Sequence, residues 1–228
     1  QSPWFVSISA YLCPMHENRF IQDRQNFLSV FHEKTGLIVG GGNTKLQPLW
    51  STFTVGDTSL MVNTGDQSDP NFGPFEGLLH IPDGATLGDS DEEPALSLQY
   101  GEETCKVTTR PENDTTMTLI YEATSNSAMN VEGHITLIPH LGGPLSSSDG
   151  HIDKLGEEAA EWSGGQGGWA EHAGWRLSLP EGSRLVWPAF PHNAYRKLGD
   201  ATVEIARIAI ALPFSKDVTR YELKLEIK

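Results

Sequence analysis

Apolar and polar residues alternate along most of this chain. Residues 221–228 alternate without interruption, and residues 115–123 and 130–138 each place three apolar side chains on one side. Such a period of two is typical of half-buried strands. We predict further strands over residues 4–11, 26–33, 36–39, 52–55, 59–63, 96–100, 104–109, 175–179, 183–187 and 202–212.

Short clusters of Gly, Pro, Asn and Asp separate these runs, at residues 34–36, 82–84, 111–114 and 180–182. These residues favour tight turns. The apolar phase slips near Ala206, which predicts a β-bulge there. Helix is possible only over 18–25, which we interpret as strand or loop, and over 157–162, which is too short to matter. The Gly-rich stretch 141–168 is predicted to be a long loop.

Many short strands at this spacing predict an all-β protein, a large antiparallel β-sandwich of the super-sandwich, jelly-roll-like kind. The length of 228 residues suits one such domain, covering residues 1–228. The chain starts at Gln1 instead of Met, so we expect either a processed mature protein or part of a longer one.

The net charge excludes some classes of binding partner. Sixteen basic and thirty acidic residues give a net charge of −14, which disfavours nucleic acid and anionic membrane surfaces as partners. No apolar run approaches the ~18 residues that a membrane span requires. The two cysteines, Cys13 and Cys105, form no disulfide framework, and the sequence leaves open whether they are bonded.

Metal-binding patterns are incomplete. Cys13 and His16 have the spacing of half a zinc site without a second pair, and His151 and Asp153 fall in the predicted loop. The acidic run 83–93 offers carboxylates of the kind that calcium takes, without EF-hand spacing. We therefore predict no metal site and no cofactor, with calcium as an open possibility.

Tryptophans suggest a ligand. Trp162, Trp169 and Trp175 fall within fourteen residues, in a segment of Gly, Ala and polar residues. Flat aromatic rings stack on the C–H faces of sugars, and the indole N–H can bind a hydroxyl. Their alternative role is to pin the loop to the sheet, and Trp175 fits a buried strand position. Downstream, His192, Asn193 and Tyr195 could line the same carbohydrate-binding cleft.

Catalytic residues are not evident. No Gly-x-Ser-x-Gly nucleophile motif is present, and the glycines at 40–42 precede Pro48 where a phosphate-binding loop would require a helix. A pair of carboxylates, or a Tyr or His base for a lyase, would be defined by the fold and not by sequence spacing. We therefore predict no catalytic residue.

Four stretches of the chain together resemble the β-sandwich region of heparinase II/III-type polysaccharide lyases. They are residues 27–45, 50–53, 174–183 and 187–191. In that family a helical toroid precedes the sandwich and carries most of the catalytic set. The resemblance implies a C-terminal β-sandwich whose catalytic partner is an N-terminal helical domain. None of the family's catalytic motifs matches a position here.

Three functions follow as alternatives. The first is an accessory, non-catalytic β-sandwich of a polysaccharide-processing protein, extracellular or periplasmic, which binds or positions a polysaccharide or oligosaccharide. The second is a complete small carbohydrate-active enzyme, a lyase or hydrolase, with its site on a sheet face. The third is a structural or interaction module whose tryptophans belong to the core.

Overall fold

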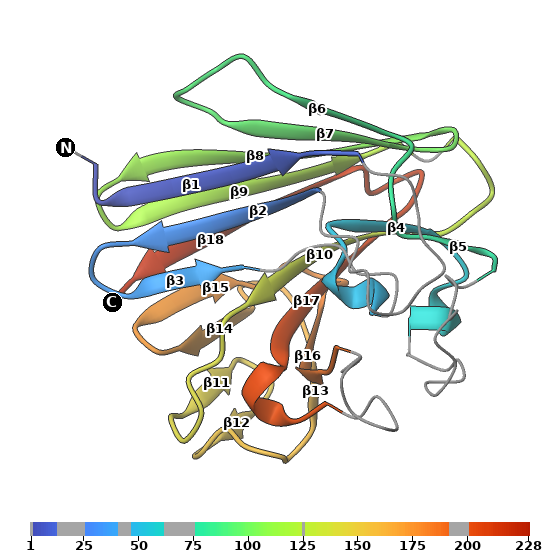
Figure 1. Cartoon of the computed structure of the whole chain (residues 1–228). Coiled ribbons are helices and arrows are strands. Elements are labelled where there is room, and N and C mark those ends of the chain that lie inside the picture. Colours follow the sequence, from blue (N-terminus) through green and yellow to red (C-terminus); the bar gives the residue numbers. More distant parts are fainter. Residues whose placement is uncertain (1, 13–25, 41–46, 62–75, 125, 192–200) are drawn as a thin grey trace.

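The computed structural model describes residues 2–12, 26–40, 47–61, 76–124, 126–191 and 201–228. Two nine-stranded antiparallel sheets pack face to face (Figure 1). Regular helix in the described residues is limited to three 3₁₀ turns, η1 (Pro48–Trp50), η2 (Thr58–Met61) and η3 (Val203–Ile205). The predicted all-β antiparallel sandwich is therefore confirmed, whereas its organisation as a single domain stays a prediction.

The first sheet, sheet A, is branched. The branch is at its central strand, β10. On one side of β10, strand β3 pairs with one end and strand β4 pairs with the other end. The order is β1 (Trp4–Ala10), β2 (Asn26–His32), β3 (Gly36–Val39), β10 (Val131–Leu137), β17 (Arg207–Phe214), β16 (Arg184–Ala189) and β13 (Ala160–Ser163), with β4 (Phe53–Gly56) on β10 and β5 (Leu78–Leu79) on β4.

The second sheet, sheet B, is unbranched, and its short strands lie at one end. The order is β12 (His151–Ile152), β11 (Leu145–Ser147), β14 (Trp169–His172), β15 (Trp175–Ser178), β18 (Arg220–Ile227), β9 (Thr116–Ala123), β8 (Glu103–Asn113), β7 (Ala95–Tyr100) and β6 (Gly84–Leu87).

The core lies between the sheets and follows the alternation of the sequence. On β18, Leu223 and Leu225 are fully buried while Glu222 and Lys224 face water. On β10, Gly133 lets the sheets approach, because a Cβ there would lie 3.1–3.2 Å from the rings of Tyr121, Phe214 and Phe53. A larger side chain at this position would therefore separate the sheets.

Four local predictions were wrong, the one near Ala206 only in part. There the chain makes η3 before β17 begins, and the pairing of β17 with β16 also shifts register between Val186 and Ala189, so a 3₁₀ turn and an irregular ladder together accompany the phase slip. Residues 58–61 form η2 instead of a strand, and β8 continues through the predicted turn to Asn113. The predicted loop 141–168 contains β11, β12 and β13, since cross-strand pairing satisfies the backbone of this Gly- and Ser-rich segment.

Candidate functional site

The hairpin of β11 and β12 organises the end of the molecule where the tryptophans lie. In its turn, Ser147 Oγ accepts hydrogen bonds from the backbone N–H groups of Asp149 and Gly150, both at 3.0 Å. The backbone N–H of Ser148 donates to Trp169 O at 3.0 Å. Asp149 accepts a 2.9 Å hydrogen bond from the backbone of Ser163, next to Trp162 in β13. The turn therefore connects the strands that carry Trp162 and Trp169.

Trp169 lies on the outer face of sheet B, where it is half-buried. The guanidinium of Arg176 stacks on its ring, 4.3 Å from the centroid. Glu171 fixes that guanidinium, accepting 2.8 Å contacts from both Nε and Nη2. Charged and polar side chains thus surround one aromatic ring that is partly open to solvent, an arrangement that suits a polar ligand with apolar C–H faces.

Trp162 has a different environment, although it borders the same turn. Its cross-strand partner is the fully buried Leu185, and the ring packs against the hydrophobic core. A Cβ on Gly150 would lie 2.3 Å from the indole Nε1, so the ring rests directly on the turn backbone. Trp162 therefore packs between the turn and the core, and its side chain is only half-exposed.

Trp175 belongs to the core. It is 2% exposed, and its ring meets that of His172 edge to face at 5.9 Å. For this residue the structure matches the alternative of a buried strand tryptophan, and it offers no ring face to a ligand. His192, Asn193 and Tyr195 lie outside the described residues.

His172 is a buried neutral histidine that closes the same end. Its Nδ1–H donates to Pro144 O at 2.7 Å, and its Nε2 accepts from the backbone N–H of His140 at 2.8 Å. Burial lowers the pKa of His172, the hydrogen bond to Pro144 opposes that change, and nearby His140 adds to it. His172 therefore ties the segment after β10 to sheet B.

A second polar group occupies the outer face of sheet A. On β10, His134 Nδ1 lies 3.0 Å from Ser51 O, and its Nε2 lies 3.2 Å from Glu132 Oε1. Arg184 Nη2 approaches the same carboxylate oxygen at 3.5 Å, and Arg184 Nη1 pairs with Glu161 at 3.0 Å. Both ring nitrogens of His134 therefore have a polar partner, and the Glu132 carboxylate is shared between His134 and Arg184.

The ionised state of Glu132 has a clear electrostatic cause. Burial raises the pKa of its carboxyl group, because a charge is costly away from water. The hydrogen bond and charge of His134 act in the opposite direction, and Arg184 adds to them. Together they hold the pKa of Glu132 below its usual range. Glu132 and His134 are both buried, so the group is a covered ion network.

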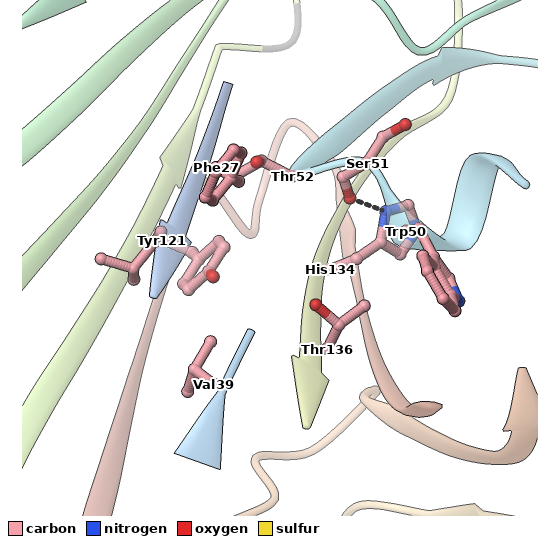
Figure 2. A pocket seen from close by; sticks show the side chains of 9 residues that line it. Phe27, Val39, Trp50, Ser51, Thr52, Tyr121, His134 and Thr136 are labelled. Carbon is pink, nitrogen blue, oxygen red and sulfur yellow. Dashed lines mark hydrogen bonds between the residues drawn. The ribbon is translucent and has the colours of Figure 1, made fainter. Parts of the chain in front are cut away.

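A small pocket reaches this network where β3 and β4 part along β10. Figure 2 shows Trp50, Ser51, His134 and Thr136 around it, and the hydrogen bond from His134 to Ser51. The pocket has room for little more than one water molecule. The buried Ser51 Oγ at its wall has no hydrogen-bond partner among the described residues.

Neither Glu132 nor His134 is recognisable as a site residue from the sequence. Alternation along β10 indicates one apolar face, yet all seven residues of this strand are buried. The other face is covered because Ser51, directly after η1, contacts His134 and because Trp50 reaches across to donate to Ala189 O at 3.2 Å. Only contacts between segments distant in sequence produce this burial, so no local signal identifies it.

Within the described ranges, no three His, Cys, Asp or Glu side chains gather as a metal-binding group. Cys105 is a free, buried cysteine, while Cys13 lies outside the described residues. None of the described segments forms a helix long and apolar enough to cross a bilayer.

Comparison with known proteins gives distant likenesses only. No family model and no curated protein matches the sequence. Among solved structures, a putative aldose 1-epimerase of Escherichia coli K12 has a TM-score of 0.46 at 9% identity, covering 98% of this chain and 99% of that one. A heparinase III with methylated lysines has a TM-score of 0.45 at 12% identity and covers 99% of this chain.

A heparan sulfate lyase from Pedobacter heparinus has a TM-score of 0.41 at 10% identity and covers 90% of this chain. The chain spans about a third of each lyase's length, 34% and 30%. At these scores and identities the likenesses assign neither a family nor a function, and membership of the heparinase II/III family stays a prediction.

Proposed function

We propose that this chain is a carbohydrate-binding β-sandwich, which binds or positions a polysaccharide or oligosaccharide on the outer face of sheet B. The observation that carries the proposal is Trp169, a partly exposed indole held on a flat sheet face between charged side chains. Sugars need both an apolar platform and hydrogen-bonding groups around it, and this face offers both.

Fixed geometry is the second argument. A rotating indole would lose conformational entropy on binding, whereas Arg176 on the ring of Trp169 already restricts its rotation. Trp162, beneath the turn, would hold this platform in place instead of contacting sugar with its full ring. His192, Asn193 and Tyr195 remain part of the proposal as further ligand contacts.

The net charge indicates which glycans fit best. At −14 the chain repels a highly sulfated polymer over long range, so neutral or weakly acidic glycans are the expected ligands. An accessory role beside an N-terminal helical catalytic domain, and an extracellular or periplasmic location, stay predictions of the sequence.

Isothermal titration calorimetry with neutral and uronate-containing oligosaccharides tests the proposal. Trp169→Ala should weaken binding at least about tenfold, which corresponds to ~1.4 kcal/mol. Phe5→Ala is the matched control, because Phe5 is an exposed aromatic residue, at 54%, on β1 of the other sheet. Equal affinities of the wild-type chain and Trp169→Ala would remove the proposal.

A further inference from the structure

Three side chains on the β11–β12 hairpin form a continuous hydrogen-bonded chain. Ser146 Oγ lies 2.8 Å from His151 Nδ1, and His151 Nε2 lies 2.8 Å from Asp153 Oδ1. All three project from the outer face of sheet B, since Ser146 and His151 are cross-strand partners and Asp153 follows His151 by two residues. A hydroxyl, an imidazole and a carboxylate are therefore aligned in that order.

The local sequence explains the alignment. Ser147 Oγ holds the four-residue turn by accepting the N–H groups of Asp149 and Gly150, which sets the register of the hairpin. Cross-strand partners have Cβ atoms about 5 Å apart, so a Ser and a His at paired positions fall within hydrogen-bond reach. The spacing Ser-x₄-His-x-Asp in residues 146–153 therefore produces the chain once the hairpin forms.

The hydrogen bonds favour one tautomer of the ring. A carboxylate only accepts, so His151 Nε2 carries the proton that it donates to Asp153. In that tautomer Nδ1 is the acceptor for the Ser146 hydroxyl proton. A base within 2.6–3.2 Å of a hydroxyl, oriented by a third group, is the arrangement that activates a serine nucleophile.

We propose that Ser146 is a nucleophile, with His151 as its base and Asp153 as the orienting group, and that it cleaves short-chain carboxylic esters. The inference does not rest on glycan binding, because the chemistry requires only an ester that reaches the open face. His151 and Asp153 side chains are 52% and 94% exposed, so a substrate can approach from solvent.

The reaction balances within these groups and water. Ser146 Oγ forms a bond to the ester carbonyl carbon while its proton moves to His151 Nδ1. The bond to the alcohol oxygen then breaks, and His151 returns the proton to the leaving alcohol. Water, deprotonated by the same nitrogen, attacks the acyl-Ser146 ester, and the acid leaves as Ser146 regains its proton.

Neighbouring residues support this assignment. Ser146 is the cross-strand partner of Glu171, whose carboxylate is neutralised by Arg176 on the same face. Trp162, resting on Gly150, acts as a positioning residue for the hairpin.

Hydrolysis of p-nitrophenyl acetate by the purified chain tests the proposal. General base catalysis contributes roughly 10²–10⁴-fold in enclosed sites, and the exposure of this pair places the expected effect near the lower limit. Ser146→Ala and His151→Gln should each lower the rate at least about tenfold. Asp153→Asn should cost less, about two- to fivefold, because water screens its contact with the ring.

Ser178→Ala serves as the matched control, since Ser178 lies on the same face and its Oγ accepts from the Lys224 backbone N–H. Covalent trapping separates the proposed route from direct attack by imidazole. Diisopropyl fluorophosphate should label Ser146 in the wild-type chain and in Ser178→Ala, and should not label it in His151→Gln. A Ser146→Ala variant that keeps the wild-type rate, or a label on another serine, would overturn the proposal.

Discussion

Replacing Glu132 with Gln tests the buried ion network directly. The carboxylate is 5% exposed and accepts from His134 at 3.2 Å, with Arg184 at 3.5 Å. Gln keeps the volume and one acceptor oxygen but removes the charge. His134 Nε2 then still faces an acceptor, while the guanidinium of Arg184 loses the buried carboxylate that it contacts. The variant therefore isolates the ionic part of the interaction.

The expected magnitude follows from burial. Breaking a buried ion pair by removing one partner costs about 3–5 kcal/mol. The amide retains a hydrogen bond worth about 1 kcal/mol, so Glu132→Gln should destabilise the fold by about 2–4 kcal/mol. Glu161→Gln is the control, because Glu161 contacts the same Arg184 with a side chain that is 62% exposed. A surface pair of that kind contributes about 0–1 kcal/mol.

Urea unfolding, followed by tryptophan fluorescence and circular dichroism, measures both variants. The folded-state pKa of Glu132 lies below its unfolded value, so its contribution is complete above the unfolded pKa of 4.5 and is lost as the pH falls through the folded value. The difference between wild type and Glu132→Gln should therefore be largest near pH 7 and shrink in acid. A loss below 0.5 kcal/mol at pH 7 would refute the reasoning, on the scale of ordinary surface substitutions at about ±0.5 kcal/mol.

Three further predictions follow. Burial raises the pKa of Glu103, but hydrogen bonds from Ser127, Asn126 and Thr124 outweigh this effect and lower the pKa to about 2. Glu103→Gln should therefore lower the free energy of unfolding by about 2 kcal/mol near pH 7, and by less at pH 3, as measured by urea unfolding. Gly150→Ala should cost about 1–3 kcal/mol in thermal melts, because the new Cβ meets Trp162 at 2.3 Å, and a wild-type melting temperature would contradict that contact. Burial, with the charge of Glu103, raises the pKa of Cys105 to about 12, so in a Cys13→Ser variant Ellman's reagent should react only after unfolding.

The sequence predicts the long strands because burial on one face imposes a period of two. β18 illustrates this: its buried leucines and its exposed charges alternate in the structure as they do in the sequence. The short strands β11 and β12 escape the same analysis, since two or three residues are too few to show a period. β11 pairs with β12 on one side and with β14 on the other, which the local composition of Ser and Gly does not indicate.

The sequence predicts the environment of some candidate site residues and not of others. Trp175 is recognisable as a core residue by its alternation with Arg176 and Leu177, and the structure buries it. Trp162 and Trp169 are only seven residues apart in sequence, yet Trp162 lies on β13 of sheet A and Trp169 lies on β14 of sheet B. The Ser146–His151 contact depends on the register of the β11–β12 hairpin. The sequence does not predict this register, because the composition of the segment is typical of a loop.

The most direct test of glycan binding is a titration of the ¹⁵N-labelled chain, observed at the indole N–H resonances of its six tryptophans. The Trp169 resonance, assigned by loss in Trp169→Phe, should shift progressively with oligosaccharide concentration. The resonances of the buried Trp175 and Trp187 should stay in place. A saturating oligosaccharide panel that leaves the Trp169 resonance unmoved, or that shifts only other indoles, would contradict the account of this face as the sugar-binding surface.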